Sequence, residues 1–135
     1  DMKNARAFPD AVVTEEREVD LHYRQMDEDP EQPDFLSEAM YYPADRYVVP
    51  YRSLYSRNIR NLFMAGRCFS CSHIGLCGPR VMKTCGQMGI ATGYAAALCK
   101  KHNVDPRGVY ERHVKELKPL MQRGVGKASL AVPTR

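Results

Sequence analysis

The sequence of 135 residues lacks several features that would assign it at once to a class of protein. It has no tryptophan, and its 20 basic and 16 acidic residues give a formal charge of +4 that is dispersed along the chain. Nucleic-acid-binding proteins usually concentrate lysine and arginine on one face or arm, so we expect no nucleic-acid partner. The opening stretch, DMKNARAFPD, has no apolar segment of the kind found in signal peptides.

A long hydrophobic run is also missing. The longest uncharged stretch lies between Lys83 and Lys100, spans 16 residues and contains three glycines. A membrane-spanning helix needs about 18 to 20 apolar residues, so this stretch predicts a buried helix and no membrane segment. The five cysteines are an odd number, which together with the lack of secretory features favours a reducing, cytoplasmic location.

No G-x-G-x-x-G motif follows a predicted strand anywhere in the sequence. Gly124-Val125-Gly126 follows a predicted helix and has no third glycine at the required offset, so it is not a dinucleotide-binding fingerprint. The chain therefore offers no visible cradle for the phosphates of a dinucleotide.

Two short strands are predicted near the beginning of the chain. The first is FPDAVV, after a turn at Phe8-Pro9-Asp10, and the second is REVDLHY, in which apolar and polar residues alternate with the period of a half-buried strand. RQMDEDPEQPDF, residues 24–35, is acidic, contains two prolines and predicts a solvated loop. These strands need pairing partners that the rest of the chain does not obviously supply.

From Tyr47 onward the sequence contains short apolar segments. RYVVPYRSL predicts an extended segment with a strand end at Pro50. NLFMAG, residues 61–66, is a short apolar run before a glycine and a long helix, which is typical of a central parallel strand whose end meets a ligand.

Two helices are predicted after this run. The first spans Arg80 to Lys101 and carries four small residues on one face: Gly86, Gly89, Gly93 and Ala97. Glycine inside a helix costs up to about 1 kcal/mol relative to alanine, so either a backbone or a flat ring approaches this face, or it packs simply on a sheet. The second helix follows an N-cap at Asp105 with Pro106 at its first position. We expect Pro119 to kink or end it, and His113 to be a core or boundary histidine.

The four cysteines at positions 68, 71, 77 and 85 raise the question of a metal or redox site. Cys68 and Cys71 form one C-x-x-C knuckle, but a zinc site usually pairs two such units. Because the second unit is missing and the pair lies in a glycine-containing loop rather than at a helix start, we expect no metal site and no redox disulfide here. Cys85 and Cys99 lie in the apolar helix, where free cysteine behaves as a small hydrophobe.

From Val48 to Tyr110 the chain resembles the C-terminal end of the bacterial FAD-dependent oxidoreductase family, and FPDAVV and VDLH resemble the end of the family's substrate domain, so the resemblance covers nearly the whole chain except the tail. The shared motifs are a Pro-Tyr-Arg strand, N-L-hydrophobic-A-G-R, S-x-x-H, G-x-x-R-V-M-x-T-C and G-x-x-x-G-x-A-A. The matching residues are Pro50, Tyr51, Arg52, Asn61, Leu62, Ala65, Gly66, Arg67, Ser70, His73, Arg80, Val81, Met82, Thr84, Cys85, Gly89, Gly93, Ala95 and Ala96. Cys71 and Cys77 depart from the small or apolar residues expected at their positions, and TEERE replaces a more usual turn.

The resemblance implies an enzyme that binds FAD and oxidises or reduces a small-molecule substrate. It places Ala65, Gly66 and Arg67 near the ribityl and phosphate groups, and the loop from Cys68 to Gly78, with Ser70, beside the flavin ring. Met82, Thr84, Cys85 and Gly89 of the following helix also lie near the ring, where the helix N-terminus stabilises negative charge. His73 and Arg80 are the expected catalytic residues, as an acid–base group and an anion anchor.

The implied fold is α/β: the C-terminal part of a Rossmann-type FAD-binding domain. We expect residues 1–46 to end a substrate or cap domain, residues 47–123 to belong to the FAD-binding domain, and residues 124–135 to form a tail. The chain is then the C-terminal portion of a larger flavoprotein, inactive alone and partnered by the N-terminal remainder. Two other classes stay open: a small metal-binding module built on Cys68, Cys71, His73 and Cys77, and a non-catalytic basic interaction domain.

Overall fold

The computed structural model describes residues 4–24 and 37–125. The strands are β1 (Ala11–Glu15), β2 (Val19–Arg24), β3 (Ser37–Tyr42) and β4 (Tyr47–Pro50). The helices are α1 (His73–Leu76), α2 (Met82–His102), α3 (Pro106–Gly108) and α4 (Val114–Arg123). Short 3₁₀ helices form at Tyr51–Leu54 and Gly66–Cys68, and a π-helical segment, Val109–His113, joins α3 to α4. The architecture is a mixture of helices and small antiparallel sheets, consistent with the α/β class.

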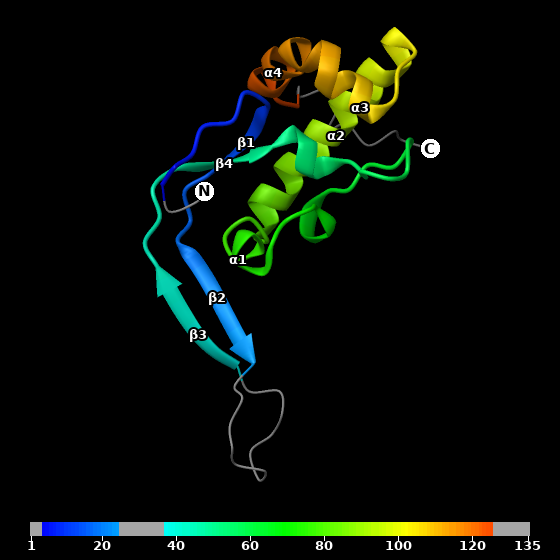
Figure 1. Ribbon diagram of the computed structural model, residues 1–135. Helices are drawn as coiled ribbons and strands as arrows, with labels where there is room; N and C mark the ends of the chain where they lie inside the picture. Colours follow the sequence, from blue (N-terminus) through cyan, green and yellow to red (C-terminus); the bar gives the residue numbers. More distant parts are fainter. Residues whose placement is uncertain (1–3, 25–36, 126–135) are drawn as a thin grey trace, which may run out of the picture.

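The strands pair as two separate antiparallel sheets of two strands each among the described residues. β1 pairs with β4, and β2 pairs with β3 in a ribbon that extends away from the helices (Figure 1). The two predicted strands are confirmed, but the expectation that the chain does not supply their partners is wrong. β3 was not anticipated from the sequence. Of the predicted loop over residues 24–35, Arg24 belongs to β2 and the remainder lies outside the described residues.

The parallel strand predicted at residues 61–66 is not formed. This stretch makes one antiparallel bridge, Tyr55 to Phe63, and the Met64 amide donates to the Leu54 carbonyl at 2.9 Å. The chain reverses between the two segments, so the stretch folds back on the residues just before it. Gly66, with φ of 61°, then turns the backbone into a 3₁₀ helix. A strand at this position needs neighbours on both sides, which the described residues do not provide.

α2 is the helix around which the core is built. Its inner face places Met88 and Ala91 against Val13 and Leu54, and further along it places Ala95 and Leu98 in a second cluster. That cluster contains Tyr51, Tyr55, Val109 and Leu117. The prediction of a long helix is confirmed, with a start two residues later than Arg80 and an end at His102. No helix in the described ranges has the length and apolarity required to cross a membrane.

The second predicted helix is also confirmed, and Asp105 caps it: its side chain accepts a hydrogen bond from the Gly108 amide at 2.8 Å. The helical path is not uniform, because the π-helical segment interrupts it before α4 begins. Pro119 lies inside α4 and does not end it, since α4 continues to Arg123 and stops at Gly124, whose φ is 64°.

Asp10 links β1 to the segment that follows β4. The residue is 1% exposed, and its carboxylate accepts hydrogen bonds from the Arg52 amide at 3.0 Å and from the Arg52 guanidinium at 2.5 Å. The guanidinium also lies over the rings of Phe8 and Tyr110. Burial opposes ionisation of Asp10, but the hydrogen bonds from Arg52 outweigh it and lower the pKa of this carboxyl.

Candidate functional site

The turn at Ala65-Gly66-Arg67 lies against the first turns of α2. A Cβ placed on Gly66 would stand 3.6 Å from the Cβ of Cys85, which is ordinary contact distance. The positive φ of Gly66 explains why glycine is suited to this position. Arg67 is exposed, whereas Ala65 packs at the edge of the core. Two of the predicted cofactor-binding segments, 65–67 and 82–85, therefore meet in the folded chain.

The N-terminus of α2 has no side-chain cap. Val81 occupies the N-cap position with extended φ and ψ, and no acidic residue lies in the first turn. The first amides of a helix have no intrahelical acceptor and carry partial positive charge. Met82, 91% exposed, leaves this terminus open on one side. A helix end of this kind is suited to binding an anionic or electron-rich group.

Thr84 faces the other way from Met82. It is buried, and its hydroxyl donates to the carboxylate of Glu15 in β1. Burial opposes ionisation of Glu15, but the Thr84 hydrogen bond and two backbone amides lower its pKa overall. In this arrangement the Thr84 side chain holds β1 against α2, and only its backbone remains available to a ligand at the helix N-terminus.

The loop between the Gly66 turn and α2 contains a short helix, α1, that was not predicted. Ser72 caps it by accepting from the Gly75 amide at 3.1 Å. His73 begins α1 and is exposed, and Cys77 is buried with its thiol 3.1 Å from the His73 carbonyl. Ser70 is exposed, and its amide donates to the Ser53 carbonyl at 2.8 Å, which anchors the loop to the core.

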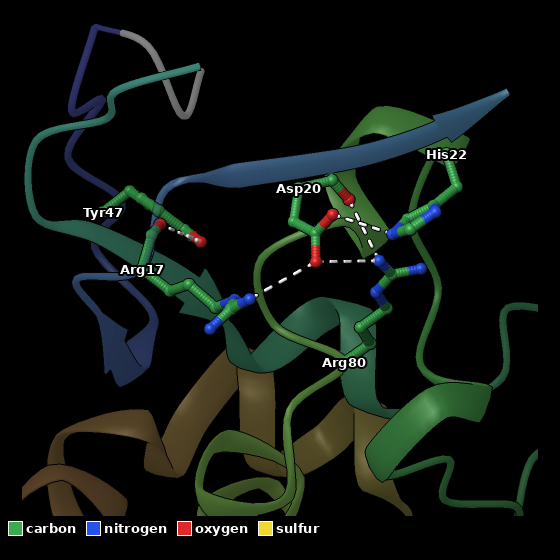
Figure 2. A network of polar contacts seen from close by, with 5 residues as sticks. All are labelled: Arg17, Asp20, His22, Tyr47 and Arg80. Atoms are coloured by element: carbon green, nitrogen blue, oxygen red, sulfur yellow. Dashed lines mark hydrogen bonds and ion pairs between the residues drawn. The ribbon is translucent and has the colours of Figure 1, made fainter. Parts of the chain in front are cut away.

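Arg80 belongs to a polar network centred on Asp20 of β2 (Figure 2). Its guanidinium lies 3.2 Å from the Asp20 carboxylate and also donates to the Asp20 carbonyl at 3.1 Å. Arg17 contributes a second ion pair at 3.3 Å, and Nε2 of His22 lies 2.8 Å from the other carboxylate oxygen. Arg80 therefore faces a carboxylate 60 residues away, so the ribbon of β2 and β3 is fixed to the start of α2.

A cavity of about 720 Å³ lies between the loop and the strands. Its lining includes Leu21, Tyr47, Phe69, Ser70, Cys71 and Pro79. The surface of this cavity is largely apolar. Among the predicted site residues Ser70 lines it, whereas His73 and Arg80 do not. The loop thus borders a space large enough for a small molecule.

The face of α2 opposite the core is uncovered. We call the exposed residues Met82, Gly86, Gly89, Gly93 and Ala97 the outer face of α2. No heavy atom lies within 4 Å of a Cβ placed on any of its three glycines, apart from the helix's own backbone. The expectation that another backbone packs on this face is therefore not met by the described residues, and helix-on-sheet packing does not account for the glycines either.

Sequence reasoning missed the long-range partners of the site. The sequence analysis treated Asp20 only as a polar position of a strand and Glu15 only as part of TEERE, although these residues hold Arg80 and Thr84. It also missed a cluster of His102, His113 and Glu116, whose ligand-type atoms all lie within 4.8 Å of one another. The i, i+3 spacing of His113 and Glu116 is a signal that could have been used, but no local pattern connects them to His102.

Comparison with known proteins gives one family. The model of the FAD dependent oxidoreductase family matches residues 1–121 of the chain. No curated protein and no solved structure gives a match.

Proposed function

The chain belongs to the FAD-dependent oxidoreductase family, and from this we propose that it forms the C-terminal part of a Rossmann-type flavoprotein, completed by an N-terminal portion. In this proposal the chain contributes one wall of the flavin site and part of the substrate site. FAD, when bound, supplies the two-electron redox chemistry. The residues of this chain orient the cofactor, supply positive electrostatic potential and shape the substrate space.

The outer face of α2 is the observation that carries the proposal. A surface helix normally turns charged residues toward water, and a helix that is uncharged all round is normally buried. Between Lys83 and Lys100 no charged residue occurs, although the outer face is exposed in this chain. Its glycines leave a flat surface on which a ring or a backbone can lie closely. The remainder of the FAD-binding domain, with the flavin, is the partner that we assign to this face.

The Gly66 turn and the N-terminus of α2 fit the polar parts of such a cofactor. Gly66 lets a ligand approach the backbone, and exposed Arg67 offers charge-assisted hydrogen bonds to phosphate or ribityl oxygens. The uncapped amides from Met82 to Thr84 favour negative charge at the adjoining flavin edge, whereas the Cys85 amide already donates to the Val81 carbonyl at 2.9 Å. Ala65, Ser70 and Gly89 complete the proposed cofactor-binding set.

His73 and Arg80 are proposed to serve the substrate side. His73, exposed at the start of α1, is the acid–base candidate. Arg80 lies between the helix start and Asp20, so its charge is partly compensated. The cavity beside the loop, about 720 Å³ and largely apolar, indicates a small substrate with an apolar portion.

The proposal is tested by comparing Gly89→Leu with Lys115→Leu. Both positions are exposed on helices, both receive the same side chain, and leucine is a good helix former. In this chain alone, neither change should lower the thermal midpoint. In the complete flavoprotein, Gly89→Leu should weaken FAD binding at least tenfold, because its side chain occupies the space assigned to the ring, and Lys115→Leu should not. Equal FAD affinity for both variants would contradict the assignment of the outer face.

A further inference from the structure

The C-terminal end of α2 and the beginning of α4 bring together two histidines and a glutamate. The Glu116 carboxylate lies 3.0 Å from Nε2 of His102 and 3.0 Å from Nδ1 of His113. The two imidazoles are stacked, with ring centroids 3.8 Å apart. From this geometry we propose that His102, His113 and Glu116 bind one divalent transition-metal ion, for which Zn²⁺ is the reference.

The donor set suits such an ion. Imidazole nitrogens and a carboxylate oxygen are common zinc ligands, and three protein ligands leave a fourth position for water. Zinc lies about 2.0 to 2.1 Å from each donor, so donors of a tetrahedral site stand about 3.3 Å apart. The nitrogen–oxygen separations of 3.0 Å are close to this value, and all candidate ligand atoms lie within 4.8 Å. The imidazoles have to rotate out of their stack to bind one ion, because their lone pairs lie in the ring planes and these planes are nearly parallel.

The backbone supports the same reading. His113 ends the π-helical segment Val109–His113 and has a φ of −126°, outside the helical range. π-Helical turns are rare and are found frequently at functional sites. Here the irregular turn sets His113 over His102, which lies on a different helix. The side chains of His102, His113 and Glu116 are 24%, 19% and 39% exposed, so the cluster is half-buried and still reachable from solvent.

Lys101 already forms an ion pair with the Glu116 carboxylate. Nζ of Lys101 lies 2.8 Å from Oε2 of Glu116. An incoming metal ion has to share this oxygen with the lysine or displace it. The lysine therefore acts as a competitor for the metal, and its removal should tighten metal binding.

The site is separate from the proposed flavin site. Its α2 ligand is the last residue of a helix of 21 residues, which is about 30 Å long at 1.5 Å per residue. A bound ion would connect α2 to α4 across the intervening α3. Because it would bind the folded chain and not the unfolded one, it should raise the thermal midpoint in proportion to the logarithm of its concentration.

The experiment uses the full chain with Cys68→Ser and Cys71→Ser in all variants, so that the two exposed thiols cannot bind metal. Zn²⁺ is titrated against a chromophoric chelator, and Co²⁺ is titrated with detection of its visible d–d bands. We expect one equivalent of each metal. His102→Ala, His113→Ala and Glu116→Gln should each weaken Zn²⁺ binding at least tenfold, and Lys101→Met should strengthen it. His22→Ala, a histidine outside the cluster, is the matched control and should leave the affinity unchanged.

Circular dichroism in the presence of a chelator checks that each variant is folded. Glu116→Gln keeps a hydrogen-bonding group, and Lys101→Met changes an exposed side chain, so we expect both variants to fold. Their Zn²⁺ affinities test the proposal even if a histidine variant unfolds. Any one of three results overturns the proposal. These are a Zn²⁺ affinity that does not change in Glu116→Gln, a Zn²⁺ affinity that does not increase in Lys101→Met, and loss of Zn²⁺ binding when only the two cysteines are replaced.

Discussion

At the scale of single residues, Asp20 shows how the chain concentrates charge beside the start of α2. The residue is 8% exposed and has Arg17, His22 and Arg80 around its carboxylate. Burial opposes its ionisation, but the hydrogen bonds from Arg80 and Arg17 outweigh burial and lower the pKa of Asp20. Arg80 is thereby held in one orientation by β2. Its remaining positive charge adds to that of the helix N-terminus.

Arg80→Ala in the complete flavoprotein should lower the reduction potential of the flavin and slow its reduction by substrate. A loss of about 1 to 2 kcal/mol in the stabilisation of negative charge corresponds to roughly 20 to 45 mV for a two-electron couple. Arg80→Lys should recover part of the potential and less of the rate, because lysine lacks the bidentate fork. Spectroelectrochemical titration and stopped-flow kinetics measure both.

The ion pair with Asp20 offers a competing account of Arg80. If the arginine only fixes the β2–β3 ribbon to α2, Arg80→Ala lowers the thermal midpoint and leaves the potential and the reduction rate unchanged. Asp20→Asn separates the two roles. This substitution removes the same ion pair but keeps the arginine. If Arg80 acts on the flavin, the reduction potential of the flavin should therefore not fall in the Asp20→Asn variant.

Gly66 gives a second prediction at this scale. Because its φ is 61°, a side chain there is strained by about 1 to 2 kcal/mol. Gly66→Ala should lower the free energy of unfolding by this amount, since the added Cβ meets only ordinary contact with Cys85. Gly89→Ala, in open space within α2, should instead raise it by up to about 1 kcal/mol. Urea denaturation of this chain measures both changes, and a Gly66→Ala variant as stable as Gly89→Ala would show that the turn is not strained.

At the scale of elements, β1 is fixed at both ends by carboxylates, a buried one at Asp10 and a half-buried one at Glu15. Asp10 precedes it and pairs with Arg52, and Glu15 ends it and accepts from Thr84. Both pKa values are lowered in the folded chain. A group with a lowered pKa contributes stability above its unfolded-state pKa and loses it as the pH falls through the folded value.

Asp10→Asn should therefore make the free energy of unfolding less dependent on pH in the acid range. The folded-state pKa of Asp10 is lowered from 3.8, so its contribution is complete at neutral pH and declines below about pH 4. At pH 7 the free energy of unfolding of the variant should be about 1.5 to 3 kcal/mol lower than that of wild type, the range for hydrogen bonds to charged groups. Urea denaturation at pH 7 and pH 3.5 should show a smaller difference for Asp10→Asn than for wild type. Exposed Asp45→Asn is the control, and an unchanged difference for Asp10→Asn would refute the link.

The elements that could be predicted from the sequence are those specified locally. Helix α2 follows from its uncharged run, and the cap at Asp105 places the second helix. The strands at β1 and β2 follow from a turn signal and alternation. β3 and the absence of a parallel strand at residues 61–66 could not be predicted, because strand formation depends on which segments become neighbours.

The same reason limits what could be predicted of the site. The motif order led to the family, and the meeting of Gly66 with Cys85 agrees with the expected closeness of their segments. The partners of Thr84 and Arg80 are 69 and 60 residues away and were not foreseen. The roles of the named residues toward flavin and substrate stay predictions.

At the scale of the whole molecule, the chain holds its inner core together and leaves one long uncharged helix face exposed. β1 and α4 pack against α2, whereas the three glycines of its outer face have no neighbouring segment within 4 Å among the described residues. The sequence has no G-x-G-x-x-G to bind the pyrophosphate of FAD. The two observations are complementary, because an N-terminal portion carrying that motif would both bind the phosphates and cover the helix.

We therefore expect this chain alone not to retain FAD, and the chain combined with its N-terminal complement to retain it. The single flavin wall that we propose for α2 and the Gly66 turn would leave most of the cofactor in water. The binding free energy should therefore be too small for micromolar affinity, which corresponds to about −8 kcal/mol. Isothermal titration of the chain with FAD, and of the reconstituted pair, measures the difference. Gly89→Leu in the reconstituted pair should reduce FAD retention while Lys115→Leu does not, which ties any gain in affinity to the outer face. Micromolar or tighter binding by the chain alone would mean that it carries a complete site, and the proposed division of the flavoprotein would be wrong.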